Sequence, residues 1–221
     1  MISQRIKILL ELNSAGRNSL LSELSMKGIS AATLDAMKLV PREYFISEDL
    51  YNHAYDDMAL PIDDNQTISQ PLTVALMTDL LEIKPGDKVL EVGTGSGYQA
   101  IILSYLGAVV YSIERIENLQ NSAKTAFEDF GINVISFLGD GSAGLPEFAP
   151  FERIIVTAGS PHTPLELKEQ LDIGGIMVIP VGDKNYQTMT KIIKTGKNKF
   201  KVTEHDSFRF VPLIGNSAWD I

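Results

Sequence analysis

The chain of 221 residues is long enough for one α/β domain with a buried core, and its net charge is −9. That charge repels phosphate backbones, so we expect no nucleic-acid partner. The chain has no cysteine, which excludes disulfides, thiolate catalysis and thiolate metal sites. Its three histidines are scattered and its acids lack metal-ligand spacing, so we expect no metal. No apolar run approaches the ~20 residues that span a bilayer, and we expect a cytoplasmic monomer that does not bind membranes.

The first forty residues predict short helices. Apolar residues recur at helical spacing from Ile6 to Leu39, and Gly16 and Gly28 interrupt the pattern. We expect this helical appendage, residues 1–40, to pack against the main domain.

Residues 41–71 have little helical or strand periodicity but are rich in aromatic, proline and polar residues. Long irregular segments inside a compact domain are often lids or binding loops. Near the end of this segment, Ser69 has two possible roles. The local sequence alone favours a helix cap, because Pro71 and an apolar stripe follow it. The alternative is a residue of a functional site.

Residues 89–98, with the sequence VLEVGTGSGY, predict a strand, a tight turn and a helix. Glycines in such a turn accept positive φ and let a ligand lie against bare backbone, beside the free N–H groups of the helix N-terminus. A dinucleotide fingerprint needs a small residue five positions after the first glycine, where this chain has Tyr98. This disfavours a nicotinamide oxidoreductase, whereas an acid followed by Gly-x-Gly-x-Gly resembles motif I of class I S-adenosylmethionine (SAM) dependent methyltransferases. The remaining alternative is an ordinary glycine-rich turn.

Acidic residues follow the next two predicted strands. The strand over 109–113 leads into Glu114, about 20 residues beyond the glycine-rich turn, where a carboxylate can bind both hydroxyls of a ribose. The strand over 134–138 is followed by Gly139-Asp140-Gly141. We expect Asp140 to accept a hydrogen bond from an adenine amino group, and the alternative is a plain turn.

Strands and helices continue to alternate up to a strand over 176–181. Two alternating runs, 188–194 and 200–208, flank a polar turn and predict a terminal hairpin. We therefore predict an α/β, Rossmann-like, doubly wound and mostly parallel sheet with a C-terminal antiparallel hairpin and N-terminal helices. The whole chain, 1–221, would form a single domain, with residues 72–221 as its SAM-binding core and hairpin.

Several motifs, in order along the chain, resemble the protein-L-isoaspartate (D-aspartate) O-methyltransferase family. The glycine-rich turn alone indicates only a methyltransferase. The blocks more specific to this family are Val-Pro-Arg at 40–42, Gln-Thr-Ile-Ser at 66–69 and Phe-Val-Pro-Leu at 210–213. Leu-Pro-Ile at 60–62, Gly-Asp-Gly at 139–141 and Ala-Pro-Phe at 149–151 accompany them.

The resemblance implies a SAM-dependent enzyme that methylates the α-carboxylate of L-isoaspartyl residues in damaged proteins and peptides and so initiates repair through a succinimide. It implies that Ser69 is the active-site residue. The cofactor-binding residues would be Glu91, Gly93, Gly95, Gly97, Glu114, Asp140 and Gly141. The substrate-binding residues would be Gln66, Thr67, Ile68, Ser69 and Val211.

Asp63-Asp64-Asn65 stands where the family often has glycines. The two acids could stiffen the loop or repel an anionic substrate, and we expect Arg42 to offset their charge. This departure keeps open a methyltransferase of the same scaffold that acts on another carboxylate or a small molecule. A non-catalytic SAM-binding or adaptor protein would show erosion of Glu91, the glycines, Glu114 or Ser69, and none of these is eroded.

Overall fold

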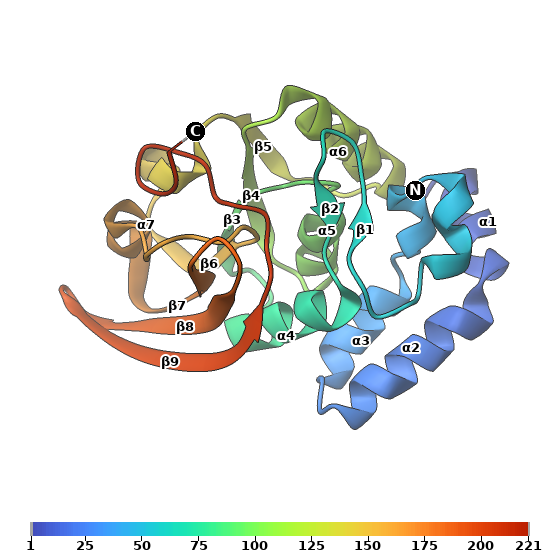
Figure 1. Cartoon of the computed structure of the whole chain (residues 1–221), viewed down its shortest axis with the longest axis horizontal. Helices are drawn as coiled ribbons and strands as arrows, with labels where there is room; N and C mark the ends of the chain where they lie inside the picture. The colour runs from blue at the N-terminus through green and yellow to red at the C-terminus, as the bar shows by residue number, and fades with distance from the viewer. Residues whose placement is uncertain (1, 221) are drawn as a thin grey trace.

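The computed structural model describes residues 2–220, in which a seven-stranded sheet forms the centre of the fold (Figure 1). The strand order is β5-β4-β3-β6-β7-β8-β9, with parallel pairing from β5 to β7 and antiparallel pairing of β7, β8 and β9. The strands of this sheet are β3 (Lys88–Val92), β4 (Val109–Glu114), β5 (Ile135–Leu138), β6 (Phe151–Val156), β7 (Leu171–Gly182), β8 (Gln187–Gly196) and β9 (Lys199–Phe208). The predicted sheet and its terminal hairpin are confirmed.

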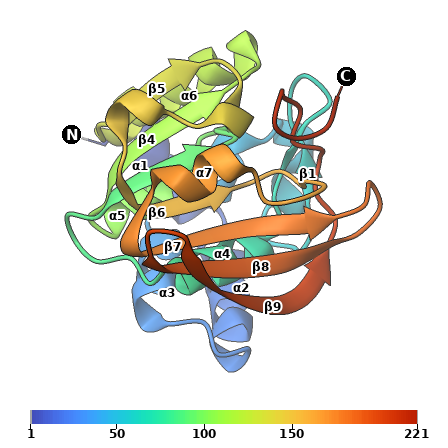
Figure 2. The same cartoon turned by 90° about the vertical axis from the view of Figure 1, so that its left-hand side faces the viewer.

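Helices cover both faces of the sheet. Helices α4, α5 and α6 lie on one face, and Figure 2 shows α7 on the other. The α-helices are α1 (Gln4–Leu12), α2 (Ser14–Met26), α3 (Ala31–Lys38), α4 (Pro71–Leu81), α5 (Tyr98–Tyr105), α6 (Glu117–Phe130) and α7 (Leu165–Gln170). Among the described residues, no helix has both the length and the apolar character needed to cross a membrane.

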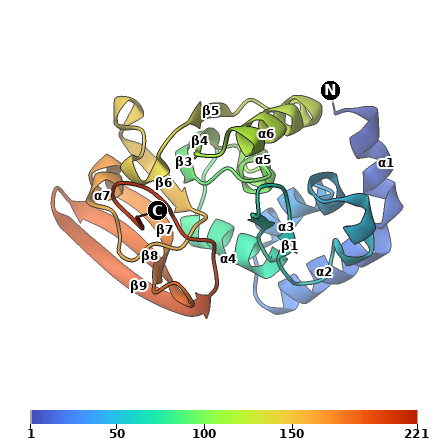
Figure 3. The same cartoon turned by 45° about the horizontal axis from the view of Figure 1, so that its top comes forward.

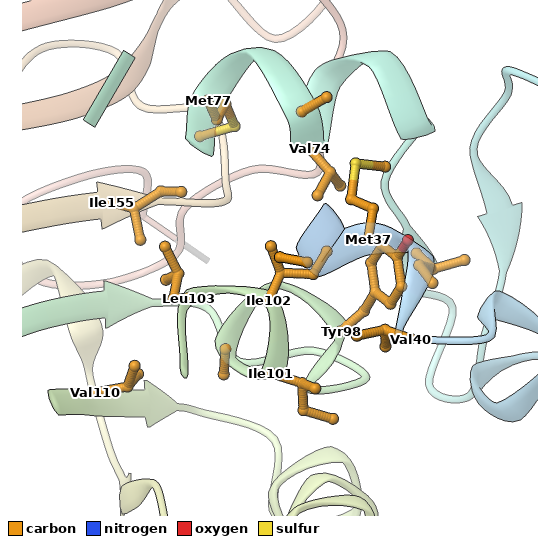
Figure 4. Close-up of a cluster of buried hydrophobic side chains, with 14 of the residues drawn as sticks. Met37, Val40, Val74, Met77, Tyr98, Ile101, Ile102, Leu103, Val110 and Ile155 are labelled. Atoms are coloured by element: carbon orange, nitrogen blue, oxygen red, sulfur yellow. The ribbon is translucent and has the colours of Figure 1, made fainter. Parts of the chain in front are cut away.

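The central strands are apolar on both sides because both faces are covered. Along β3, Val89 belongs to the core cluster beneath α5, while Leu90 belongs to the cluster beneath α7. Figure 4 shows the first cluster, in which Ile102 of α5 lies close to Met37 of α3 and Val74 of α4. Packing of this kind fixes α5, and with it the turn that precedes it, against the sheet.

The N-terminal helices α1, α2 and α3 gather at the side of the molecule away from β8 and β9 (Figure 3). Their apolar residues, such as Ile6, Leu20 and Leu24, are buried in the cluster that also contains α5. The expected packing against the main domain is therefore found.

The segment between α3 and α4 contains more local structure than its sequence pattern predicts. It forms the 3-10 helices η1 (Arg42–Phe45) and η2 (Glu48–His53) and a short hairpin of β1 (Leu60–Pro61) and β2 (Thr67–Ile68). Two further 3-10 turns, η3 (Gly141–Ala143) and η4 (Pro146–Phe148), follow β5. Elements this short lack the repeating apolar pattern by which longer helices and strands are predicted.

The prediction that Ser69 caps α4 is wrong. The N-cap residue is Gln70, and no side-chain cap bond is made there. The backbone N–H of Leu72 instead donates to Asp57 Oδ1 at 2.8 Å. The carboxylate that satisfies this helix end thus comes from fifteen residues earlier in the chain, and Ser69 is left free for another role.

Candidate functional site

A cavity lies at the carboxyl ends of β3, β4 and β6, with the β1–β2 hairpin and the C-terminal tail as its other walls. In open α/β sheets, ligands bind at this edge of the strands. Its lining residues are Gln66, Thr67, Ile68, Ser69, Val74, Met77, Val92, Gly93, Thr94, Gly95, Ser96, Tyr98, Gln99, Ile113, Glu114, Arg115, Ile116, Leu119, Gly141, Thr157, Ala158, Val211, Pro212, Leu213 and Ile214.

The glycines of the turn after β3 have different surroundings. A Cβ at Gly95 would meet no atom within 4 Å, and this residue lines the cavity with φ of +52°. A ligand can therefore lie directly on its backbone. A Cβ at Gly97 would come within 2.9 Å of Phe127 and 3.2 Å of Ala123. Gly97 thus allows α5 to approach α6 closely, and it does not line the cavity.

Glu114 joins the loop after β4 to the glycine-rich turn. Its Oε2 accepts a hydrogen bond from the Gly95 N–H at 2.9 Å, and its Oε1 accepts from the N–H groups of Arg115 at 2.8 Å and Ile116 at 3.0 Å. Each carboxylate oxygen can accept more than one hydrogen bond. The fixed carboxylate at the cavity wall therefore retains capacity for hydroxyl donors of a ligand.

Glu91 lies behind the glycine-rich turn and does not line the cavity. Its side chain is fully buried, and its Oε2 accepts a hydrogen bond from Ser112, whose hydroxyl also contacts that of Thr94. Burial raises the pKa of Glu91 to about 8; the Ser112 hydrogen bond opposes this shift and the charge of Glu114 adds to it. In this structure Glu91 therefore contacts the cavity only through Ser112 and Thr94.

Asp140 faces the C-terminal tail. Its carboxylate accepts hydrogen bonds from the Ser142 N–H at 2.8 Å, the Ser142 hydroxyl at 2.7 Å and the Asn216 N–H at 2.8 Å. Burial acts to raise the pKa of Asp140, but these hydrogen bonds outweigh it and the pKa is lowered. Gly141, the next residue, lines the cavity, whereas Asp140 does not.

The tail completes the cavity wall. Gly159, just after β6, donates its N–H to the Val211 carbonyl and accepts from the Leu213 N–H, both at 2.8 Å. The indole N–H of Trp219 donates to the Gly159 carbonyl at 3.1 Å. These bonds hold residues 211–214 along the cavity.

The hairpin presents Gln66 to Ser69 from the opposite side. Leu60 pairs with Ile68, and Pro61 pairs with Thr67. The turn between the two strands closes through a hydrogen bond from the Gln66 N–H to the Asp63 carbonyl at 3.1 Å.

The expectation that Arg42 offsets the charge of Asp63 and Asp64 is wrong. Arg42 is fully buried, and its guanidinium donates hydrogen bonds to the carbonyls of Ala54, Met58 and Ser69. A side chain held by three backbone carbonyls in the interior is not available to two acids at the tip of a hairpin.

The cavity thus brings together most of the predicted site residues, which come from segments far apart in the chain. Glu91, Gly97 and Asp140 lie outside its lining. The predicted residues that line it are Gln66, Thr67, Ile68, Ser69, Gly93, Gly95, Glu114, Gly141 and Val211.

Sequence reasoning did not single out Thr157, which lines the cavity, or Trp219, which holds the tail that lines it. Thr157 lines the cavity and donates to the carbonyls of Val92 at 3.0 Å and Gly93 at 2.6 Å. Its place directly after a buried strand is the signal that could have identified it. Trp219 lies in a tail without periodicity, so the local sequence contains no such signal.

The mostly parallel sheet has a glycine-rich turn after β3 and an acid at the end of β4, both on one cavity, and Tyr98 stands where a dinucleotide fingerprint needs a small residue. This is the arrangement of a class I SAM-dependent methyltransferase. The family model described as Protein-L-isoaspartate(D-aspartate) O-methyltransferase (PCMT) matches residues 15–218. The chain belongs to the protein-L-isoaspartate (D-aspartate) O-methyltransferase family, whose members methylate isoaspartyl residues with SAM as the methyl donor.

Relatives and solved structures agree with this assignment. The chain is 46% identical over 205 residues to a protein-L-isoaspartate O-methyltransferase of Cytophaga hutchinsonii, covering 92% of this chain and 93% of the relative. It is 50% identical over 201 residues to that of Flavobacterium psychrophilum, covering 90% and 93%. A putative protein-L-isoaspartate O-methyltransferase from Plasmodium falciparum, solved with S-adenosyl-L-homocysteine, has a TM-score of 0.78 and 25% identity and covers 90% of this chain and 98% of its own.

Proposed function

We propose that the cavity described above binds SAM and an isoaspartyl residue side by side, and that Ser69 holds the α-carboxylate that receives the methyl group. One observation chiefly carries this proposal. The end of the β1–β2 hairpin, the glycine-rich turn and Glu114 all line the same cavity, although 45 positions separate Ser69 from Glu114.

The residues of the cavity fit SAM. The open space where Gly95 would carry a Cβ suits a ligand that lies against the backbone. The Glu114 carboxylate, fixed by three backbone N–H groups, suits the two hydroxyls of a ribose. Gly141 lines the cavity beside Val92 and Ile113, and we assign it to the adenine ring. We assign Glu91, Gly97 and Asp140 supporting roles toward the same ligand, through the turn, the packing of α5 and the tail.

The substrate side of the cavity lies between the hairpin and the tail. Gln66, Thr67, Ile68 and Ser69 line one wall and Val211 the other. The Ser69 hydroxyl can donate a hydrogen bond to a carboxylate, and hydrogen bonds to charged groups contribute about 1.5–3 kcal/mol. We therefore assign these residues to the isoaspartyl group, with Ser69 as an orienting donor that forms no covalent intermediate.

The reaction needs positioning more than acid–base chemistry. SAM supplies a methyl group made electrophilic by the attached sulfonium. The acceptor carboxylate, with a pKa near ~4, is already ionised at neutral pH, so no strong general base is required. Holding two reactants in line can save on the order of 7–11 kcal/mol. The following backbone amide nitrogen can attack the methyl ester carbonyl, with loss of the amide proton and departure of methanol, and this forms a succinimide. Hydrolysis of the succinimide then returns some normal aspartate.

The first test is transfer of radiolabelled methyl from SAM to a short isoaspartyl peptide, with the matching aspartyl peptide alongside. We expect base-labile methylation of the isoaspartyl peptide only. Ser69→Ala should lower kcat/KM for this peptide by about 10- to 100-fold, because one charge-assisted hydrogen bond is lost. Ser25→Ala, an exposed serine of α2, is the matched control and should leave kcat/KM unchanged. Measurable SAM binding without transfer to either peptide would contradict the acceptor assignment.

We further propose that residues 1–221 act as one domain and that the protein is a cytoplasmic monomer without a nucleic-acid partner. Burial of α1, α2 and α3 residues in the same cluster as α5 supports the single domain, and the net charge of −9 disfavours nucleic acid. Size-exclusion chromatography with light scattering tests the monomer, and cell fractionation tests the location.

A further inference from the structure

Arg42 connects three points of the irregular segment that carries Ser69. Its Nη1 donates to the Ala54 carbonyl at 2.8 Å, and its Nη2 donates to the carbonyls of Met58 at 2.9 Å and Ser69 at 3.0 Å. The first two acceptors lie before the β1–β2 hairpin and the third lies directly after it. One side chain therefore fixes both ends of the hairpin relative to each other.

The position of Arg42 is costly for a charged group. It is fully buried, and within residues 2–220 no carboxylate forms an ion pair with it. A buried charge without an ion-pair partner costs free energy. A guanidinium does offer several donors in a rigid planar fork, which sets the relative positions of its acceptors. We therefore attribute the buried position of Arg42 to its hydrogen bonds with the surrounding backbone and not to ion pairing.

A second anchor lies on the other side of Ser69. The N–H of Leu72 donates to Asp57 Oδ1 at 2.8 Å. Asp57 belongs to the same short stretch, residues 54–58, that provides two of the three carbonyls bound by Arg42. Ser69 is thus held between two fixed points, its own carbonyl and the N–H three residues further on.

We propose that Arg42 is a positioning residue for methyl transfer: it holds the backbone of Ser69 so that the serine hydroxyl faces the acceptor carboxylate. Arg42 does not line the cavity and so acts through Ser69. The inference rests on the proposed role of Ser69 in binding the isoaspartyl carboxylate.

Arg42→Lys tests this role. Lysine keeps the charge but lacks the fork that spans three carbonyls. We expect the KM for an isoaspartyl peptide to rise about tenfold or more and the KM for SAM to stay within about twofold. A purely structural role would instead lower the active fraction and leave both KM values unchanged, and that result would overturn the inference.

Arg17→Lys is the matched control. Arg17 is also buried, and its guanidinium bonds the Leu10 carbonyl and the Tyr55 hydroxyl rather than the ends of the hairpin. We expect both KM values of this variant to equal those of the unmodified protein. An equal rise in peptide KM for both arginine variants would show a general packing effect and would also contradict the inference.

A double-mutant cycle asks whether Arg42 acts through Ser69. If it does, adding Arg42→Lys to Ser69→Ala should change the peptide KM little, because the group being positioned is already gone. Multiplicative effects would overturn the inference. Should Arg42→Lys fail to fold, Asp57→Ala removes the other anchor, and the same non-additivity with Ser69→Ala is expected.

The assays separate two failures. Absence of methyl transfer by the unmodified protein, with SAM still bound, would refute the acceptor assignment and with it the role of Arg42. Normal activity that falls in Ser69→Ala, together with an unchanged peptide KM in Arg42→Lys, would refute the role of Arg42 alone.

Discussion

Glu91 shows how one residue can support a site that it does not touch. Its carboxyl group is fully buried, and its Oε1 has no hydrogen-bond partner among the described residues. Through Ser112 it is linked to Thr94, which lines the cavity. At neutral pH its raised pKa, about 8, keeps a proton on the group. The side chain behind the glycine-rich turn is therefore an uncharged carboxylic acid.

We expect the stability of the protein to depend on pH through Glu91. Its pKa is raised from 4.5 to about 8 on folding. Between these values the folded chain keeps a proton that the unfolded chain releases, so this contribution to stability falls as pH rises. Glu91→Gln is neutral throughout and should gain a few kcal/mol relative to the unmodified protein between about pH 5 and pH 8.

Urea unfolding at both pH values measures this difference. Glu117→Gln, which changes an exposed glutamate at the start of α6, is the control and should follow the unmodified protein. Parallel pH profiles for Glu91→Gln and the unmodified protein would show that Glu91 keeps an ordinary pKa.

At the scale of single residues, the sequence predicted which residues belong to the site motifs better than it predicted what each residue contacts. The glycines at 93, 95 and 97 belong to one motif, yet packing divides them: Gly95 faces the cavity and Gly97 faces α6. Asp140 likewise follows a strand, as expected, but its carboxylate bonds a tail residue more than seventy positions away. Local sequence does not contain such partners.

At the scale of elements, the β1–β2 hairpin is built on an unusual turn. Its two central residues, Asp64 and Asn65, both have φ of +56° although neither is glycine. Two successive positive φ values are typical of a type I′ turn, for which Asp-Gly and Asn-Gly are favoured. Asp64 and Asn65 therefore occupy backbone positions that glycine would adopt with less strain.

Asn65→Gly should raise the free energy of unfolding by about 0.5–1 kcal/mol, because glycine adopts the left-handed region without strain. Asn65→Ala should lower the free energy of unfolding by about 1 kcal/mol. Alanine is disfavoured in the left-handed region, which asparagine tolerates because its side chain can hydrogen-bond locally. Chemical denaturation of both variants checks the pair. A loss of stability in Asn65→Gly would mean that the asparagine side chain, and not the backbone, holds the turn.

The start of α4 shows why the structure of residues 41–71 could not be predicted from the local sequence. Ser69 precedes Pro71 in a pattern that favours a local cap, but Asp57 satisfies the Leu72 N–H instead. The longer elements, such as α6 and β8, were predicted because their own apolar periodicity specifies them. A helix end bound by a distant carboxylate has no such pattern.

At the scale of the whole molecule, the tail returns from the edge of the sheet to its centre. After β9 the chain crosses back, so that residues 211–214 line the cavity and Val211 and Leu213 bond Gly159 (Figure 1). Trp219 closes this arrangement through its bond to Gly159 and lies beneath the Lys184 ammonium, 5.3 Å from the ring centre. The cavity therefore depends on the last part of the described chain.

Trp219→Ala should loosen this tail. We expect faster hydrogen exchange at the Leu213 amide and a rise of about two- to tenfold in the KM for an isoaspartyl peptide, since one hydrogen bond and its packing are lost. Hydrogen-exchange mass spectrometry and steady-state kinetics measure these effects. Tyr186→Ala removes a largely exposed aromatic residue and should change neither quantity. Unchanged exchange in Trp219→Ala would show that the tail is held without the indole.

The sequence by itself determined the α/β class, the strand and helix order, the glycine-rich turn, Glu114 and the family, because these depend on periodicity and on motifs that are continuous in the chain. Only the tertiary structure decided which predicted residues line the cavity, that Arg42 binds carbonyls rather than acids, that Asp57 accepts a hydrogen bond from the first turn of α4, and that the tail forms a wall. The physical reason is that these contacts join groups far apart in sequence, whose partners are fixed only when the sheet and its helices have packed.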